Sequence, residues 1–350
     1  MAASPSSFLN VCTGKTPDSI PVWFMRQAGR SLPEYAAVRG TGDILHAISQ
    51  PELVTEITLQ PVRRHGVDAA VLYSDIMVPL HAIGFGVEIK PGVGPVISQP
   101  FQDKSDLNRI RGLDGEADTP YVLEAIRQLR KELAVPLLGF VGAPFTLACY
   151  AVEGGPSKNF TRTKSLMHSD PELWNALMEK LTALCIDSLN SQIDAGAQAI
   201  QLFDSWAGAL SPHDYAHQVA PHSRKLFSAI RQRDVPSVHF GVATGELPKE
   251  MTNVGPDVLG VDWRVPLDVA RERSGASVLQ GNLDPAVCLG PADSVFAQAD
   301  RVIDEGQGGG HIFNLGHGVL PNTDPGILTA LVDHVHSKPP GGPIDKPTRK

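Results

Sequence analysis

The stretch Ala197-Gln-Ala-Ile-Gln-Leu-Phe203 is a mainly apolar run between two segments of helical period, residues 170–195 and 213–231. A short run of this kind is typical of a strand that is buried on both faces of a parallel sheet. The polar residues Asp204-Ser205-Trp206 follow it directly, where a strand would end in a loop. This succession of helix, strand, loop and helix predicts an α/β fold with parallel strands and right-handed crossovers.

Seven further runs resemble this one, and helical patterns separate many of them. Eight strands that alternate with helices predict a (β/α)8 TIM barrel. The further predicted strands are residues 20–25, 69–73, 136–141, 236–240, 258–261, 277–280 and 311–315. The further predicted helices are residues 51–65, 119–133, 265–273, 291–305 and 324–335.

The chain has no linker that would divide it. We therefore expect residues 1–336 to form a single barrel domain and residues 337–350, rich in Pro, Gly and Lys, to be a disordered tail. Residues 77–118 are an insertion between the second and third strands, and residues 85–97 within it predict a small β-hairpin. The uncharged run 134–152 contains two prolines and two glycines, so we interpret it as a buried strand plus a loop rather than a membrane span.

The composition is that of a globular protein, with 350 residues, 42% apolar and 19% charged residues and a formal net charge of −8. Because the chain is net acidic, we expect it to bind neither nucleic acid nor an anionic membrane. The four cysteines form no CxxC pair, so neither a disulfide framework nor a cysteine-rich zinc site is expected. The first residues show no secretion signal, and we expect a cytoplasmic protein.

Polar residues that directly follow the predicted strands are the candidates for an active site, because barrel active sites lie at the carboxyl ends of the strands. Arg26 and Arg30 follow the first strand, where their guanidiniums could bind carboxylates or phosphates, or form structural salt bridges. Asp75 follows the second strand and could be a general base, a metal ligand, a cation-binding group or a partner of Arg26. The candidates after the third, fourth and eighth strands are Tyr150, Ser205 and His317.

Several other chemistries lack their sequence motifs. The chain has no Walker loop, no dinucleotide-binding glycine fingerprint after the first strand, no HExxH and no G-x-S-x-G elbow. Its 12 histidines are scattered and give no tetrahedral metal pattern. No lysine closely follows a predicted strand, which disfavours a Schiff-base mechanism.

Two long stretches carry a specific resemblance. Pro21-Val-Trp-Phe-Met-Arg-Gln-Ala-Gly-Arg-Ser-Leu-Pro-Glu-Tyr35 resembles the N-terminal signature of the uroporphyrinogen decarboxylase family, and residues 139–155 resemble its second signature. Ser31 departs from the pattern, since many members have Tyr there. The resemblance extends over residues 7–336, and its shorter stretches are residues 72–77, 203–208, 239–245, 280–285 and 314–319.

The resemblance implies a homodimeric (β/α)8 barrel that uses no cofactor and no metal. It implies an enzyme that removes the carboxyl groups of four acetate side chains of uroporphyrinogen III, giving coproporphyrinogen III on the route to haem. The substrate-binding residues that it implies are Arg26, Gln27, Ala28, Gly29, Arg30, Asp75, Tyr150, Ser205 and His317. The catalytic residues would be Asp75, Arg26 and His317.

The chemistry of these residues suits that substrate, which carries eight carboxylates around a macrocycle with four pyrrole N–H groups. Arg26 and Arg30, assisted by His317, would bind carboxylates, while the acceptor-only carboxylate of Asp75 would receive the N–H groups. A pyrrole that is protonated on a ring carbon can itself accept the electrons that carbon dioxide leaves behind, and the charge of Asp75 would stabilise this cationic ring. The proton donor remains open between Arg26 and His317.

Two alternatives remain. One is a zinc-dependent corrinoid methyltransferase of the same barrel family, which would require a His-x-Cys pair; the corresponding stretch here is His239-Phe240-Gly241, and no His-x-Cys occurs in the chain. The other is a tetrapyrrole-binding barrel without activity. A carboxylate at the centre of the site, Asp75, argues against it, because a rim of cations alone would bind the carboxylates.

Overall fold

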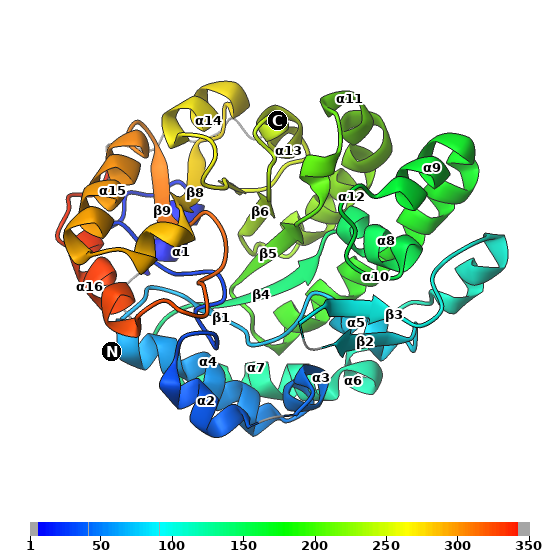
Figure 1. Ribbon diagram of the computed structural model, residues 1–350, viewed down its shortest axis with the longest axis horizontal. Helices are drawn as coiled ribbons and strands as arrows, with labels where there is room; N and C mark the ends of the chain where they lie inside the picture. The colour runs from blue at the N-terminus through cyan, green and yellow to red at the C-terminus, as the bar shows by residue number, and fades with distance from the viewer. Residues whose placement is uncertain (1–5, 41, 91, 342–350) are drawn as a thin grey trace.

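A parallel sheet of seven strands curls around the centre of the molecule, with helices packed outside it (Figure 1). The computed structural model describes residues 6–40, 42–90 and 92–341. The sheet order is β1-β4-β5-β6-β7-β8-β9, so the strands of this sheet follow one another in chain order. The strands are β1 Ala70–Val71, β4 Leu137–Gly142, β5 Ala199–Asp204, β6 Ser237–Gly241, β7 Val258–Gly260, β8 Val278–Leu283 and β9 Gly310–Leu315.

The first predicted strand, residues 20–25, lies between the two edge strands and closes the barrel. Val22 forms an isolated parallel bridge with Phe313 of β9, and the Phe313 N–H donates to the Pro21 carbonyl at 2.8 Å. On the other side, the N–H of Asp68 donates to the Val22 carbonyl at 2.8 Å, just before β1. The pairing stays short because Pro21 has no N–H and the Val22 N–H donates to the Asp68 carboxylate at 2.7 Å. The predicted (β/α)8 barrel is confirmed.

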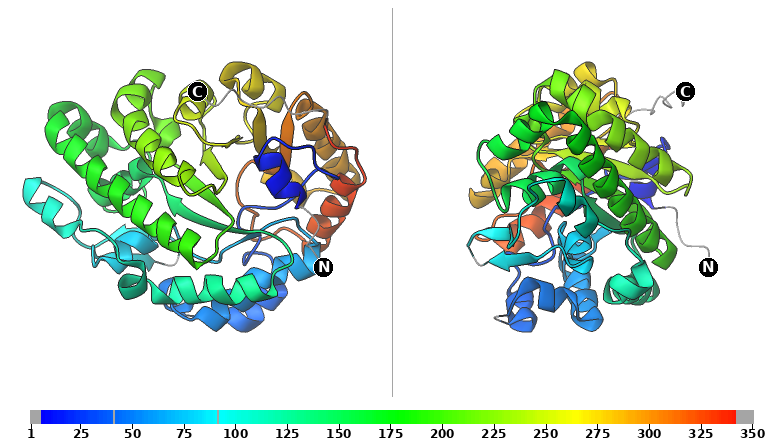
Figure 2. Two further views of the ribbon diagram at one scale, coloured as in Figure 1. Left: turned by 180° about the vertical axis from the view of Figure 1, so that it is seen from behind. Right: turned by 90° about the vertical axis from the view of Figure 1, so that its right-hand side faces the viewer.

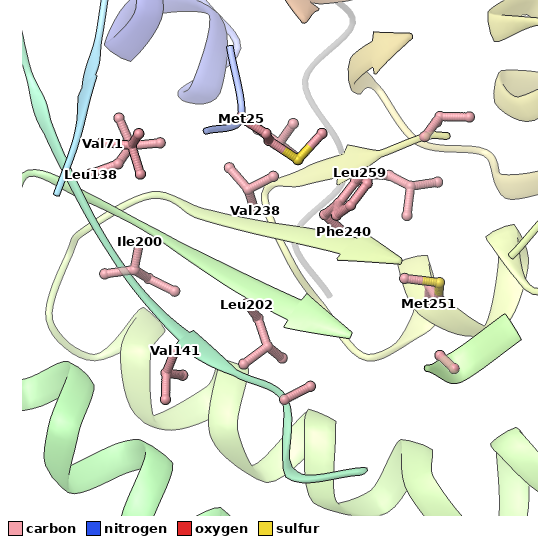
Figure 3. Packing of buried hydrophobic residues seen from close by; sticks show 14 of the residues in the cluster. Met25, Val71, Leu138, Val141, Ile200, Leu202, Val238, Phe240, Met251 and Leu259 are labelled. Carbon is pink, nitrogen blue, oxygen red and sulfur yellow. The ribbon is translucent and has the colours of Figure 1, made fainter. Parts of the chain in front are cut away.

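The interior of the barrel contains a chain of polar side chains. Gln280 of β8 donates from Nε2 to Oε1 of Gln201 of β5 at 3.0 Å, and the Trp23 indole donates to Oε1 of Gln280 at 3.0 Å. Because β5 and β8 are not neighbours in the sheet, these side chains meet across the interior. The alternate residues face outward, as Val141 and Leu202 do toward the surrounding helices (Figure 3).

The outer helices agree with the predicted segments, and many begin with proline, whose fixed φ and missing N–H suit the first helical turn. The helix at residues 213–231 differs, because a π-turn, η3 Tyr215–Val219, interrupts it. The helices that match predicted segments are α4 Pro51–His65, α7 Pro120–Glu132, α10 Pro171–Ala195, α12 Ala220–Arg231, α14 Leu267–Ser274, α15 Ala292–Glu305 and α16 Pro325–His336.

Shorter elements fill the loops. Helix α1 lies beside β9 and is seen most clearly when the molecule is turned (Figure 2). The remaining α-helices are α1 Ser7–Cys12, α2 Pro33–Arg39, α3 Ile44–Ile48, α5 Val78–Ala82, α6 Gly115–Asp118, α8 Pro144–Glu153, α9 Thr161–Ser169, α11 Pro212–Asp214 and α13 Pro248–Asn253. The 3-10 turns are η1 Lys104–Arg109, η2 Ala207–Ala209 and η4 Pro285–Leu289.

The interpretation of residues 134–152 as a strand plus a loop is wrong in its second half. The strand is β4, but Pro144 begins helix α8, which ends at the left-handed Gly154 with φ of 83°. Eight of its residues that follow Pro144 are buried, so the segment shows no polar face that would reveal a helix. In the part of the chain that the structure describes, no helix is long and apolar enough to cross a membrane.

The predicted hairpin of the insertion is confirmed as strands β2 Val87–Lys90 and β3 Gly94–Ile97, which pair antiparallel. The insertion packs against α8, since the Ile97 N–H donates to the Gly154 carbonyl at 2.9 Å and the Phe101 N–H to the Ala151 carbonyl at 2.8 Å. Of the predicted disordered tail, residues 342–350 lie outside the described residues.

Candidate active site

Arg26 and Arg30 project from the loop that follows residues 20–25. Both have a left-handed backbone, with φ of 60° and 50°, which is uncommon for residues other than glycine. The loop is fixed to its neighbour, because the Met25 N–H donates to Oδ1 of Asn314 at 3.1 Å and the Val319 N–H donates to the Met25 carbonyl at 2.9 Å. These contacts offset a backbone conformation that costs energy, a combination that is frequent at functional sites.

Gln27, Ala28 and Gly29 lie between the two arginines and are buried. Gln27 accepts the Phe24 N–H at Oε1, at 2.9 Å, and donates from Nε2 to the Ala69 carbonyl at 3.0 Å, so its side chain ties the loop to the start of β1. Gly29 has φ of +102°. These three residues fix the conformation of the loop that carries the two arginines. Their contact with a substrate stays a prediction, and such a contact would be made mainly by their backbone groups.

Asp75 lies in the loop that follows β1. Its Oδ1 accepts the Met77 N–H at 2.9 Å, and its charge interacts with Arg26 and Tyr150. Burial raises the pKa of Asp75, against the opposing effects of the Met77 hydrogen bond and the Arg26 guanidinium. By area the residue is half-buried.

The Arg26 side chain packs against the loop that follows β9, although the residue is exposed by area. A Cβ placed on Gly318 would lie 2.4 Å from Cδ of Arg26, so the arginine side chain rests on the backbone of the loop after β9. Burial, followed by the charge of Arg30, lowers the pKa of Arg26, while Asp75 and Tyr150 act in the other direction.

His317 lies in the loop that follows β9. Burial, together with the guanidiniums of Arg26, Arg30 and Arg264, lowers its pKa to about 4. The imidazole is therefore neutral at pH 7 in the free protein, and it adds no positive charge until anions bind beside it. Its ring meets the edge of Trp263, with the centroids 6.3 Å apart.

Tyr150 and Ser205 lie on neighbouring elements. Burial, then the charge of Asp75, raises the pKa of Tyr150 on α8 to about 12, and its ring centroid lies 5.8 Å from that of Trp206. Ser205 is half-buried in the loop after β5. That loop is tied to α8, because Thr146 Oγ1 donates to Asp204 at 3.0 Å and accepts the Trp206 N–H at 3.3 Å.

The structure therefore gathers five of the predicted residues in one electrostatic cluster, while Ser205 directly precedes Trp206, whose ring packs against that of Tyr150. The clustered residues are Arg26, Arg30, Asp75, Tyr150 and His317. They come from three different segments of the barrel and one helix, as expected for a site at the carboxyl ends of the strands.

A row of three phenylalanines on the inward face of the barrel was not predicted from the sequence. Phe140, Phe203 and Phe240 pack edge to face, with centroids 5.3 Å and 6.1 Å apart along the row. Phe140 is in register with Gln201, and Phe203 with Phe240, so all three share the inward face. The signal was present in the alternation along residues 199–203, where Gln201 and Phe203 belong to one face.

His239, the histidine of the methyltransferase alternative, lies in the barrel wall. It is fully buried, with Nε2 3.5 Å from Oδ2 of Asp204 and Nδ1 3.4 Å from the Met251 carbonyl. Within residues 6–40, 42–90 and 92–341, no three His, Cys, Asp or Glu side chains form a group that could hold a metal ion.

A (β/α)8 barrel whose strands end at a desolvated carboxylate and several guanidiniums is typical of enzymes that act on small anionic substrates. Comparison with known families gives a match of residues 3–338 to the model of uroporphyrinogen decarboxylase (URO-D). The chain belongs to the uroporphyrinogen decarboxylase family.

Relatives named uroporphyrinogen decarboxylase match almost end to end. The Streptomyces coelicolor protein is 56% identical over 340 residues, covering 96% of each chain. The Corynebacterium diphtheriae protein is 53% identical over 347 residues, covering 96% of this chain and 100% of its own.

A solved methyltransferase from Methanosarcina mazei superposes with a TM-score of 0.79 at 21% identity, covering 94% of this chain and 97% of that one. A B12-independent methionine synthase from Shewanella gives 0.56 at 14% identity, covering 91% and 95%. At these identities the likeness concerns the fold alone.

Proposed function

We propose that this protein removes carbon dioxide from the four acetate side chains of uroporphyrinogen III, giving coproporphyrinogen III without a cofactor. The observation that carries the proposal is Asp75, a desolvated carboxylate that follows β1 and whose charge interacts with Arg26. Family membership supports the same reaction.

The proposed binding mode follows from the charges of the site. Arg26 and Arg30 bind peripheral carboxylates, and Asp75, which when ionised has only acceptor sites, receives the pyrrole N–H groups. Phe140 and Phe203, which are half-buried on the inward face, offer an apolar surface to the macrocycle. Tyr150 and Ser205 hydrogen-bond further carboxylates.

The chemical step then needs a proton and an electron sink. Protonation of a ring carbon next to the acetate-bearing position makes the pyrrole cationic, and loss of carbon dioxide returns the electron pair of the broken C–C bond to that ring. A second proton converts the resulting exocyclic methylene to methyl, and loss of the proton first added to the ring carbon restores the neutral pyrrole, so one proton is consumed for each carbon dioxide released. The charge of Asp75, fixed beforehand in a site poor in water, stabilises the cationic ring.

We assign delivery of the proton to one of two groups, Arg26 or His317. Burial lowers the pKa of Arg26 from its ordinary value, which makes this guanidinium a stronger acid than one in water. The pKa of His317 is about 4 in the free protein, and the carboxylates of a bound substrate would raise it. The pH dependence of kcat and kcat/KM in the wild type and in His317→Gln separates the two.

An anaerobic assay with reduced uroporphyrinogen tests the proposal, with the products separated by chromatography. We expect intermediates with seven, six and five carboxylates, followed by coproporphyrinogen. Binding of the macrocycle without any loss of carbon dioxide would instead support a tetrapyrrole-binding barrel.

The assembly is part of the same proposal. We expect residues 1–336 to act as one catalytic domain, residues 337–350 as a tail, and two chains to form a cytoplasmic homodimer. Light scattering after gel filtration would give the mass of two chains; a mass of about 37.5 kDa would contradict the dimer.

A further inference from the structure

The guanidinium of Arg264 is held beside the predicted site by its neighbours. Its Nη1 donates to Oδ2 of Asp262 at 2.7 Å, its backbone N–H donates to Oδ1 of the same carboxylate at 3.0 Å, and its Cζ lies 3.9 Å from the ring centroid of Trp263. The side chain is nevertheless 47% exposed. Arg264 is thus oriented in advance, with N–H groups still open to a ligand.

The loop that carries Arg264 has little freedom to move. Asp262 is buried and also accepts the Ala243 N–H, and Asn282 donates from Nδ2 to the carbonyls of Asp262 and Val265 at 2.8 Å and 2.6 Å. A guanidinium on such a support loses little conformational entropy when it binds an anion.

Arg264 belongs to the same mouth as His317. A Cβ atom placed on Gly316 would lie 2.3 Å from the backbone nitrogen of Trp263, so the loops after β7 and β9 are in direct contact. Arg264 is among the three guanidiniums that lower the pKa of His317, and its effect there exceeds the opposite effect of Asp262. The ion pair with Asp262 therefore does not cancel the positive charge of Arg264 toward the site.

The outer side of Arg264 faces an open concavity of about 360 Å³ between the loops after β6 and β7. Arg273, which also lines it, is already engaged with the Gly245 carbonyl at 2.9 Å and with Glu246 at 3.8 Å. Of the two arginines that line this concavity, Arg264 is therefore the one that borders the predicted site.

We propose that Arg264 binds a peripheral carboxylate of the tetrapyrrole substrate, as a specificity residue at the rim between the loops after β6 and β7. The inference rests on the proposed function. Arg26 and Arg30 come from one loop, whereas the eight carboxylates of the substrate surround a broad ring. Carboxylates on another side of that ring need a cation from another loop, and Arg264 supplies it.

The test compares Arg264→Gln and Arg264→Lys with the wild-type enzyme. We expect Arg264→Gln to raise KM for uroporphyrinogen about tenfold, as for the loss of one charged hydrogen bond, with kcat within about twofold. Arg264→Lys should recover most of this affinity. The effect should shrink at high salt, because a site open to solvent is screened.

A matched control removes the same charge elsewhere. Arg63→Gln on α4 deletes an arginine paired with Glu56 at 2.8 Å and should leave KM unchanged. Binding is also measured without turnover, by fluorescence titration with the oxidised macrocycles uroporphyrin and coproporphyrin. Uroporphyrin has twice as many carboxylates, so Arg264→Gln should weaken its binding more.

Distinct results would overturn the inference. KM within twofold of the wild type at low salt would show that Arg264 binds no carboxylate. Equal, salt-independent losses in the Gln and Lys variants, with a lower Tm, would show that Arg264 only supports Asp262. An inactive wild-type enzyme would contradict the proposed function instead, and the porphyrin titrations would still report on Arg264.

Discussion

Asp75 and Asp204 both lie at the carboxyl ends of barrel strands, yet their surroundings differ. Asp204 is fully buried in the wall, where Thr146 donates to it and His239 lies 3.5 Å away. Asp75 is half-exposed, accepts one backbone N–H and interacts electrostatically with the Arg26 guanidinium. The difference indicates that a position at a strand end does not assign a role, because the side on which the side chain emerges determines whether it meets the guanidiniums of the proposed site or the outer helices.

The largest expected effect is that of Asp75→Asn on turnover. The amide keeps the size of the side chain and loses its charge, so kcat should fall about 100- to 1000-fold, as when one preorganised electrostatic group is removed from an active site. Anaerobic initial rates measure the effect, and urea unfolding checks that stability is retained. Near-normal kcat would remove Asp75 from the proposed mechanism.

His317→Gln sharpens the assignment of the proton donor. If His317 donates the proton, kcat/KM of the wild type should fall as the pH rises through about 4, the pKa of His317 in the free protein. The corresponding fall in kcat should lie at a higher pH, because bound carboxylates stabilise the imidazolium. The variant should then lose this pH dependence, and its kcat should be about 100-fold lower. A change in KM alone would favour Arg26 as the donor.

Asp204→Ala should act mainly on stability. It leaves the buried Thr146 hydroxyl and His239 without their partner, so the free energy of unfolding should fall by about 1–3 kcal/mol. Asp204→Asn keeps an acceptor for Thr146 and should recover part of that loss. Denaturant unfolding measures both variants. If either variant lost kcat as severely as Asp75→Asn while remaining folded, the contrast between the two carboxylates would fail.

The smallest expected effect concerns Asp68, a carboxylate before β1 that accepts from Val22 and contacts His336 at 2.7 Å. The hydrogen bond to Asp68 raises the pKa of His336. This pair therefore stabilises the fold fully below pH 6.5, the ordinary value for histidine, and the stabilisation is lost as the pH rises through the raised pKa. At most about 1 kcal/mol is involved. His336→Asn should remove this pH dependence from thermal unfolding, and an unchanged dependence would exclude the pair.

The sequence was sufficient for the architecture, because strands buried on both faces alternate with amphipathic helices along the whole chain. It was insufficient for α8, since Pro144 reads as a helix breaker although it occupies the first turn, and the helix that follows lacks a polar face. Local pattern cannot reveal that a helix is enclosed by protein on nearly all sides.

The candidate site could be predicted as a set of strand-end residues, but not its charge state. The low pKa of His317 results from its burial and from guanidiniums on two other loops, one of them that of Arg264, which is distant in sequence. The hydrogen bonds by which the Gln27 amide ties its loop to β1 were likewise not predicted from the sequence. Such partnerships depend on tertiary contacts.

The glutamine pair inside the barrel has a geometric consequence. Gln201 and Gln280 belong to strands that are not paired with each other. Their 3.0 Å hydrogen bond therefore fixes the distance across the barrel between β5 and β8. An extra strand, or a shift of either strand by one residue, would separate the two amides or turn one toward the helices. The hydrogen bond therefore favours one number of strands and one strand register. It thereby keeps the loops from which Arg26, Asp75 and His317 project at constant spacing.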